Sequence, residues 1–246
     1  MAAIALTDAS VFELKKSLRD EFPEAKSAHI TEALAFSLGF RTHAALQAAL
    51  GGPDKDAPVL LLDPDRMTAR LEEFGHPPAP EFDFELMLDQ VSSLVSTADD
   101  WAYRIEYKSK RQKAWRNLMV SAVNMALAKK LFTLRPGDNR WSAAPDGELF
   151  EFTLKSGLPV LGYICDAGYN ELTIRAAVNA KERRVFAGNA GFETGDAVGM
   201  TWVERERGYW MQSADHLFRC RQALLAPLAE LSVEPVGYGD RGRVIL

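Results

Sequence analysis

The chain has 246 residues, 47% of them hydrophobic, and a net charge of −5 at pH 7. This composition is typical of a globular protein with one large domain or two smaller ones. No apolar run reaches the roughly 18 residues of a membrane span, and the N-terminus has no basic lead-in or signal core, so we expect a cytoplasmic protein. The two cysteines, Cys165 and Cys220, form no CxxC pair, which favours reduced thiols over a disulfide framework.

The charge is unevenly divided along the chain. Residues 1–107 hold nine Lys and Arg against 19 Asp and Glu, whereas residues 108–246 hold 20 against 15. Such a division fits an acidic part docked on a basic part, or a basic part that meets an anionic partner. Composition alone leaves both interpretations open.

The first fifty residues predict three short helices. Apolar residues spaced three and four apart indicate a helix over residues 11–22, which Pro23 ends. Ser27 is a capping residue for a second helix that reaches Gly39, and a third runs from about Thr42 to Leu50. We therefore expect a three-helix module over residues 1–52.

The second and third of these helices have the spacing of a DNA-binding helix-turn-helix. Base reading needs side-chain donors and cations, whereas the third helix offers Thr42, His43 and Gln47 among alanines and leucines, with Arg41 as its cation. We interpret the module as one for packing or docking, with residues 30–50 as a possible surface for a protein partner.

Two segments resemble known proteins. The segment ELKKSLRDEF…SAHITEALAFSLGFRTHAALQAAL resembles the helical module of bacterial proteins described as glyoxalase-related. The resemblance covers about forty residues and identifies no catalytic residue. The segment RQKAWRNLMVSAVNMALAKKLFTLRPGDNRW is similar to uncharacterised proteobacterial proteins that are often plasmid-associated. The resemblance implies a bacterial family but no activity.

Residues 53–81 have the composition of a linker with one short helix. Asp63-Pro64 is a start signal for a helix over residues 65–74, and the stiff segment HPPAP, residues 76–80, indicates a spacer between the acidic and basic parts. The predicted α+β domain then covers residues 82–246. Its first element is a helix over residues 82–95, followed by a strand in DDWAYRIEY.

A long central helix is predicted over residues 110–132, because the run LMVSAVNMALA is apolar nearly all round. Its start is unusual, since the cations lie where the helix dipole favours anions. One interpretation is a phosphate or nucleic-acid site with an aromatic ring for stacking. The other is a solvated end, or pairing with Asp99, Asp100 and Glu106. The candidate anion-binding residues are Lys108, Lys110, Arg111, Lys113, Trp115 and Arg116.

The second half of the chain predicts strands. Apolar and polar residues alternate in residues 149–154 and 172–178, and LPVLGYI and AVGMTWVERERGYWMQ add strands, the latter as a hairpin that turns near Arg207-Gly208. A helix is expected from Ser213 to Pro227, and RVIL as a last strand. The predicted fold class is α+β, with an antiparallel sheet and helices on one face.

Several motifs are weak evidence of chemistry. GYGDRG, residues 237–242, matches GxGxxG but is followed by too little chain for a dinucleotide fold, so we interpret it as a turn before the last strand. His216 and Cys220 have a helical i, i+4 spacing that suits a metal, but without further ligands. Cys165 beside Asp166 is interpreted as a small core residue rather than a nucleophile. We predict neither a metal nor a cofactor.

Two polar segments have simpler interpretations. RPGDNRW, residues 135–141, has the composition of a tight turn after the long helix. Glu204 and Glu206 share one strand face, which we expect to face solvent rather than to form an acid/base pair.

Three hypotheses about function follow. The first is a non-catalytic interaction or accessory protein, the second a nucleic-acid-associated factor that uses the basic cluster of residues 108–116. The third is an enzyme with a pocket between sheet and helices, built from Glu204, Asp215, His216 and Cys220. No motif specifies a reaction, and the first hypothesis is the preferred one.

Overall fold

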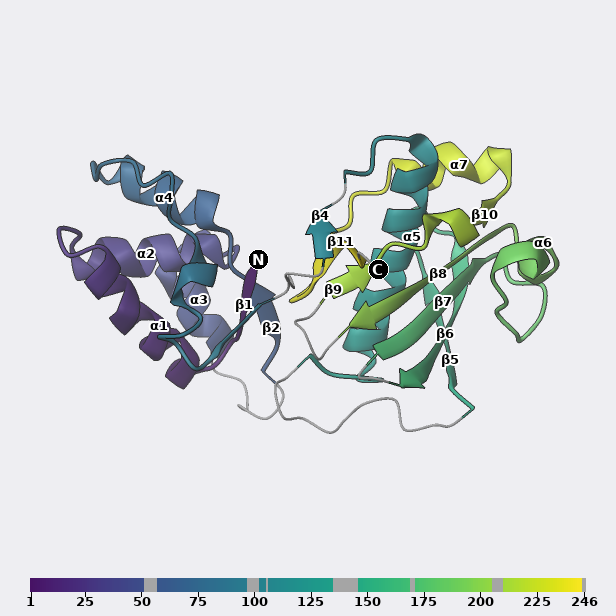
Figure 1. The fold of residues 1–246 in the computed structure, drawn as a ribbon, viewed down its shortest axis with the longest axis horizontal. Coiled ribbons are helices and arrows are strands. Elements are labelled where there is room, and N and C mark those ends of the chain that lie inside the picture. The colour runs from purple at the N-terminus through teal and green to yellow at the C-terminus, as the bar shows by residue number, and fades with distance from the viewer. Residues whose placement is uncertain are drawn as a thin grey trace. The chain divides into compact units, whose positions relative to one another are not determined.

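The structure is a computed structural model of the chain. It describes residues 1–50, 57–96, 102–104, 106–134, 146–168, 171–204 and 210–244. The chain forms two compact units, the first made of Met1–Ala98 with Val236–Tyr238 and the second of Asp99–Pro235 with Gly239–Leu246 (Figure 1). The predicted α+β fold class is confirmed, because helices and strands build separate layers in each unit. Within the described residues, no helix has the length and apolar character needed to cross a membrane.

The first unit combines helices with a small sheet. Its three strands lie in the order β2-β1-β3, with antiparallel pairs on both sides of β1. The strands are β1 (Ala2–Ala5), β2 (Val59–Leu61) and β3 (Leu94–Ser96). The helices are α1 (Asp8–Glu21), α2 (Ser27–Ser37), α3 (His43–Leu50), α4 (Pro64–Glu73) and the 3-10 helix η2 (Phe84–Met87).

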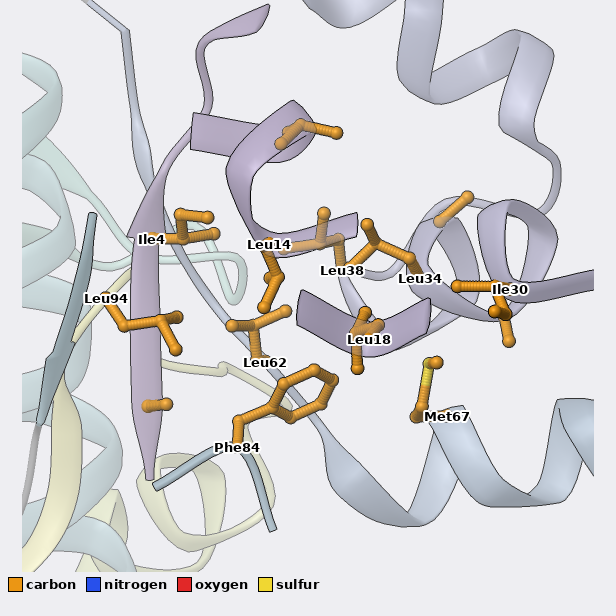
Figure 2. Packing of buried hydrophobic residues seen from close by; sticks show 14 of the residues in the cluster. Ile4, Leu14, Leu18, Ile30, Leu34, Leu38, Leu62, Met67, Phe84 and Leu94 are labelled. Atoms are coloured by element: carbon orange, nitrogen blue, oxygen red, sulfur yellow. The ribbon is translucent and has the colours of Figure 1, made fainter. Parts of the chain in front are cut away.

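The core of this unit draws on every one of these layers. Figure 2 shows apolar side chains of α1 and α2 meeting side chains of β1, β3, α4 and η2. The buried residues labelled there are Ile4, Leu14, Leu18, Ile30, Leu34, Leu38, Leu62, Met67, Phe84 and Leu94. The predicted three-helix module is therefore only part of a larger unit, because a sheet and a fourth helix complete its core.

Helix α3 turns small residues toward solvent. Leu46 and Leu50 are buried, whereas the alanines between them and Gln47 are exposed. The carboxylate of Glu32 accepts a hydrogen bond of 3.0 Å from the backbone N–H of His43 at the start of α3. In a helix-turn-helix protein the start of this helix would face DNA, which is anionic, so a carboxylate placed there favours the packing interpretation.

The segment expected as a linker is built into the first unit. Met67 and Leu71 of α4 are buried in its core, and Asp63 caps this helix by accepting from the N–H of Arg66. His76 forms a hydrogen bond of 2.9 Å with His29 of α2, whose ring also stacks on Phe74. Residues 76–80 are thus held against α2 at their start rather than forming a free spacer.

The helix predicted over residues 82–95 is wrong. The chain instead forms η2, which Asp83 caps by accepting from the N–H of Glu85, and then β3. Phe84 and Val91 are buried, but Phe84 lies in the 3-10 helix and Val91 lies between this helix and β3. Their spacing suits more than one backbone, and pairing of β3 with β1 decides between them.

The second unit is built on a large sheet with the order β4-β11-β9-β8-β7-β6-β5, and β10 also pairs with β8. The pairs are antiparallel except for β11 with β9, which is parallel. The strands are β4 (Ala102–Arg104), β5 (Glu148–Thr153), β6 (Pro159–Gly168), β7 (Glu171–Val178), β8 (Ala197–Glu204), β9 (Trp210–Gln212), β10 (Arg219–Cys220) and β11 (Gly239–Val244). The strands predicted from alternation are confirmed, while the turn expected at Arg207-Gly208 lies outside the described residues.

One face of this sheet is covered by the long helix α5 (Lys110–Ala128), which ends earlier than the predicted residue 132. Gly199 of β8 lies so close to α5 that an added Cβ would come within 2.9 Å of the Met119 sulfur. Helix α7 (Gln222–Ala229) packs beside α5 (Figure 1). A glycine in the central strand thus lets the predicted buried helix approach the sheet closely.

The C-terminal elements differ from the expectation. Instead of one helix from Ser213, the chain forms the 3-10 helix η4 (Asp215–Leu217), then β10, then α7, with Pro227 inside α7. The motif GYGDRG is not a turn before the last strand, since Gly239 and Gly242 lie within β11 itself. A helix over residues 213–227 is therefore wrong, because Arg219 and Cys220 pair with β8.

Candidate functional site

The six residues of the predicted anion site begin at a well-capped helix start. Ser109 accepts a hydrogen bond from the N–H of Gln112, and the Gln112 side chain accepts one from the N–H of Ser109, which makes a capping box. Lys108 pairs with Glu106 at 3.3 Å, while Asp99 and Asp100 lie outside the described residues. Lys110 and Lys113 are exposed.

Trp115 is not available for stacking, because its side chain is fully buried. Its indole Nε1–H donates a hydrogen bond of 3.0 Å to the carbonyl of Met200 in β8. The aromatic ring thus anchors α5 on the sheet and cannot receive a base.

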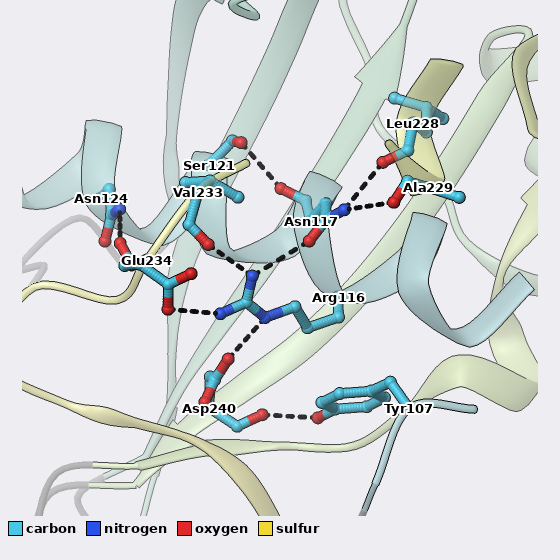
Figure 3. Close-up of polar contacts among 10 residues, drawn as sticks. All are labelled: Tyr107, Arg116, Asn117, Ser121, Asn124, Leu228, Ala229, Val233, Glu234 and Asp240. Atoms are coloured by element: carbon cyan, nitrogen blue, oxygen red, sulfur yellow. Dashed lines mark hydrogen bonds and ion pairs between the residues drawn. The ribbon is translucent and has the colours of Figure 1, made fainter. Parts of the chain in front are cut away.

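Arg116 is held in a polar network inside the second unit (Figure 3). Its Nε donates to Asp240 at 2.5 Å, and its two Nη groups donate to the carbonyl of Val233, to Asn117 and to Glu234. The Arg116 and Asp240 side chains are only 11% and 10% exposed. Because its guanidinium N–H groups already donate to acceptors within the protein, Arg116 links α5 to the chain around β11.

Asn117 extends this network to the end of α7. Its amide donates to the carbonyls of Leu228 and Ala229 at 2.9 and 3.1 Å, which satisfies carbonyls that a helix end leaves unpaired (Figure 3). Tyr107 donates from its hydroxyl to the carbonyl of Asp240 over 2.5 Å. Two members of the predicted cluster, Trp115 and Arg116, therefore hold the fold together.

Arg111 takes a different direction from Arg116. It donates to the carbonyl of Phe218, and Arg219 of β10 donates to the same oxygen at 3.1 Å. No carboxylate among the described residues pairs with either guanidinium group. Two cations that meet at one carbonyl oxygen repel each other, and a bound anion would offset this repulsion.

Arg219 links this point to the loop between β7 and β8, residues 179–196, which we call the basic loop. Its Nη2 donates to Asn189 at 3.3 Å, and its Cβ lies so close to Gly191 that a side chain there would meet it at 3.0 Å. The basic loop contains the 3-10 helix η3 (Gly188–Ala190) and the short helix α6 (Gly191–Thr194), which Figure 1 shows at one end of β7 and β8.

The basic loop lies on the sheet face opposite to α5. Its Val185 is buried against Leu161, Ala177 and Val198, which lie opposite one another in register on neighbouring strands. The carbonyl of Val185 accepts a long hydrogen bond of 3.4 Å from Arg175. This anchor fixes the middle of the loop to the sheet.

Asp196 fastens the two ends of the basic loop. Its carboxylate accepts from the Asn179 side chain at 3.1 Å and from Arg221 at 2.7 Å. The hydrogen bond from Asn179, followed by the bond and charge of Arg221, lowers the pKa of Asp196 below its ordinary value. The carboxylate is therefore ionised and in place at neutral pH.

Charged and aromatic side chains crowd the outer side of this anchored loop. Phe186 and Phe192 are 46% and 44% exposed, which is unusual for phenyl rings. Arg183 and Arg184 are exposed, and neither has a hydrogen bond or an ion pair with any residue that the structure describes. We call the following six residues the basic-aromatic surface: Lys181, Arg183, Arg184, Phe186, Phe192 and Arg219.

The sequence analysis missed this surface, although a signal was present. The run KERRVF, residues 181–186, brings three cations beside an aromatic ring. Arg219 could not be added from sequence, because pairing of β10 with β8 brings it to the loop, and the exposure of Phe192 within the loop is likewise visible only in the structure. Of the six predicted anion-binding residues, only Arg111 is linked to this surface. The link is the carbonyl of Phe218, which accepts hydrogen bonds from both Arg111 and Arg219.

The residues proposed for an enzyme pocket do not come together. Glu204 ends β8, whereas Cys220 pairs with Ala197 at the start of the same strand, so they are about 23 Å apart along it. Glu204 is buried rather than facing solvent, and Glu206 lies outside the described residues. His216 and Cys220 lie in η4 and β10, not on one helix face.

Cys220 does not show the features of a reactive cysteine. Burial raises the pKa of Cys220 to about 11, against the opposing effect of Arg111. Cys165 is half-buried on β6, in register with Thr173 of β7. RPGDNRW falls on residues outside the described part of the chain, so its predicted turn stays a prediction.

Comparisons with known proteins add no relative. No model of a protein family matches the chain, and neither a curated protein nor a solved structure matches it. The resemblance to glyoxalase-related and plasmid-associated proteins therefore stays a prediction. The docking role of residues 30–50 also stays one.

Proposed function

We propose that this protein is a non-catalytic accessory protein that binds a polyanion through the basic-aromatic surface. The observation that carries the proposal is the pair Arg183 and Arg184, which are exposed and form no ion pair with any described residue, on a loop that is fastened at both ends. Free guanidinium groups on a fixed frame are suited to phosphate or sulfate oxygens, because little order is lost on binding.

Two further features support this proposal. The basic loop together with residues 219 and 221 carries five cations and three carboxylates. One of the carboxylates, Asp196, is already paired with Arg221. The five cations are Lys181, Arg183, Arg184, Arg219 and Arg221. In addition, Arg111 and Arg219 converge on one carbonyl oxygen, where an anion would relieve their repulsion. The site thus replaces the cluster of residues 108–116 as the place for an anionic partner.

Binding to immobilised heparin, a polyanion without bases, tests this function. The salt concentration that elutes the full-length protein should fall when Arg183→Glu and Arg184→Glu are combined, because each phosphate or sulfate contact adds to the salt dependence. Lys16→Glu with Arg19→Glu is the matched control, since it makes the same charge change on two exposed residues of α1. Equal elution of the two variants would refute the proposal.

A second variant guards against misfolding. Arg183→Gln with Arg184→Gln keeps polar side chains on the loop, and both residues are exposed, so the melting temperature should not change measurably. This variant should elute between the wild-type protein and the charge-reversed one. Full retention of heparin binding by it would also count against the proposal.

A further inference from the structure

We infer that the polyanion is single-stranded nucleic acid, whose bases stack on Phe186 and Phe192 while its phosphates meet the arginines beside them. The inference rests on the function proposed above and names its partner. Proteins that bind single strands combine cations along the backbone with aromatic rings for the bases, and the basic-aromatic surface has both.

The two rings project from a segment whose backbone is held by hydrogen bonds to Thr194. The N–H of Phe186 donates to the hydroxyl of buried Thr194 at 3.3 Å, and the N–H of Lys181 donates to the carbonyl of Thr194 at 2.9 Å. Val185 is buried, which turns the next side chain, Phe186, outward. Gly191 and Thr194 of α6 are likewise buried, so that Phe192 faces solvent.

Cations lie beside the Phe192 ring. The ammonium of Lys181 donates to the Phe192 carbonyl at 2.7 Å, and the guanidinium carbon of Arg221 lies over the ring at 6.0 Å from its centre, so that a base would stack on the opposite face. A base that stacks on such a ring brings its phosphate to within reach of these cations. Because just under half of each phenyl residue is exposed, each ring rests on the protein with one part and offers the rest to a ligand.

A single strand fits this surface better than a duplex or a bilayer. Bases inside a duplex are already stacked on one another, so Phe186 and Phe192 would find no free base face. A continuous anionic bilayer would also meet the exposed carboxylates of Glu182 and Glu193, which lie among the cations. A flexible single strand can pass between these carboxylates and reach both rings.

The test is fluorescence anisotropy of the full-length protein with labelled oligothymidylate and oligouridylate of about 20 nucleotides. We expect these strands to bind at least about tenfold more tightly than a hairpin duplex with the same number of phosphates. Phe186→Leu and Phe192→Leu should each weaken the single-strand complex at least about fivefold, because leucine keeps an apolar side chain without a stacking face. Phe186→Tyr with Phe192→Tyr should restore wild-type binding.

The outcomes separate this inference from the function on which it rests. If the leucine variants keep heparin binding and lose the oligonucleotides, both stand. If they keep the oligonucleotides, or if the duplex binds as tightly as the single strands, the inference fails while polyanion binding survives. Binding to phosphatidylserine vesicles but not to oligonucleotides would replace it with a membrane surface. If neither pair of arginine substitutions weakens heparin binding, the proposed function itself fails.

Discussion

Arg116 and Asp240 form an ion pair of 2.5 Å although they lie 124 positions apart in the chain. Both side chains are almost inaccessible to solvent, so neither charge is compensated by water. The pair joins the first half of α5 to β11 and lies inside the second unit.

Asp240→Asn should lower the free energy of unfolding by about 3 kcal/mol, because it removes the buried carboxylate partner of Arg116 and leaves only the exposed Glu234 to balance the charge. Denaturant unfolding followed by circular dichroism measures this change. Glu234→Gln is the matched control, since Glu234 bonds the same guanidinium at 3.2 Å but is 81% exposed, and it should cost less than about 0.5 kcal/mol. Similar losses in the two variants would show that burial of the pair does not matter.

The basic loop should loosen in acid. The pKa of Asp196 is lowered in the folded chain, so its contribution to stability is present above the ordinary Asp pKa and is lost as pH falls through the lowered value. The protection factors for amide hydrogen exchange of Lys181 and Asp196, whose N–H groups bond within the loop and to β7, should then fall. Asp196→Asn should remove this pH dependence, whereas Glu193→Gln, on the same loop, should keep it.

Cys220 should be slow to react with thiol reagents in the native protein. With its pKa raised to about 11, roughly one thiol in a thousand is ionised at pH 8. In a Cys165→Ser variant, we expect the native rate with a disulfide reagent to be at least about tenfold below the rate in denaturant. It should rise with pH up to about 11. Equal native and denatured rates would contradict the burial of the thiol.

Gly162 should not tolerate a side chain. It lies opposite Phe150 in the β5–β6 pair, and an added Cβ would come within 2.3 Å of the phenyl ring. Gly162→Ala should therefore cost about 1 to 3 kcal/mol of unfolding free energy. Adding Phe150→Leu should recover part of this loss, because the shorter side chain leaves room for the methyl group. Strict additivity of the two changes would argue against a direct clash.

The periodicity of the sequence was sufficient to locate the main elements of the second unit. Strand β5 alternates between buried and exposed residues, and β7 keeps its apolar residues buried although its polar Thr173 is buried as well. The apolar run of α5 identifies a central helix. The same reasoning failed at residues 82–95 and 213–227, where short apolar spacings fit a helix as well as they fit a 3-10 turn beside a strand. Pairing with β1 and with β8 decided these segments, and pairing is not visible in a single sequence.

The candidate site was predicted less well than the fold, for a physical reason. Successive residues of a helix point in directions about 100° apart, so cations that are close in sequence diverge in space. Arg116 turns to Asp240, Arg111 turns to Phe218, and Lys113 faces solvent. The cations that do gather come from the loop of residues 179–196 and from β10, which the sheet brings together.

The first unit is discontinuous in sequence, and this has a consequence for how the chain is made. Gly237 adopts a left-handed φ of +74° and lies so close to Val59 that a side chain there would strike its carbonyl oxygen, while Tyr238 beside it is fully buried. A ribosome delivers residues 1–98 long before residues 236–238. The first unit must therefore wait, incomplete, until residues 236–238 have been synthesised, and no single cut of the chain releases it whole.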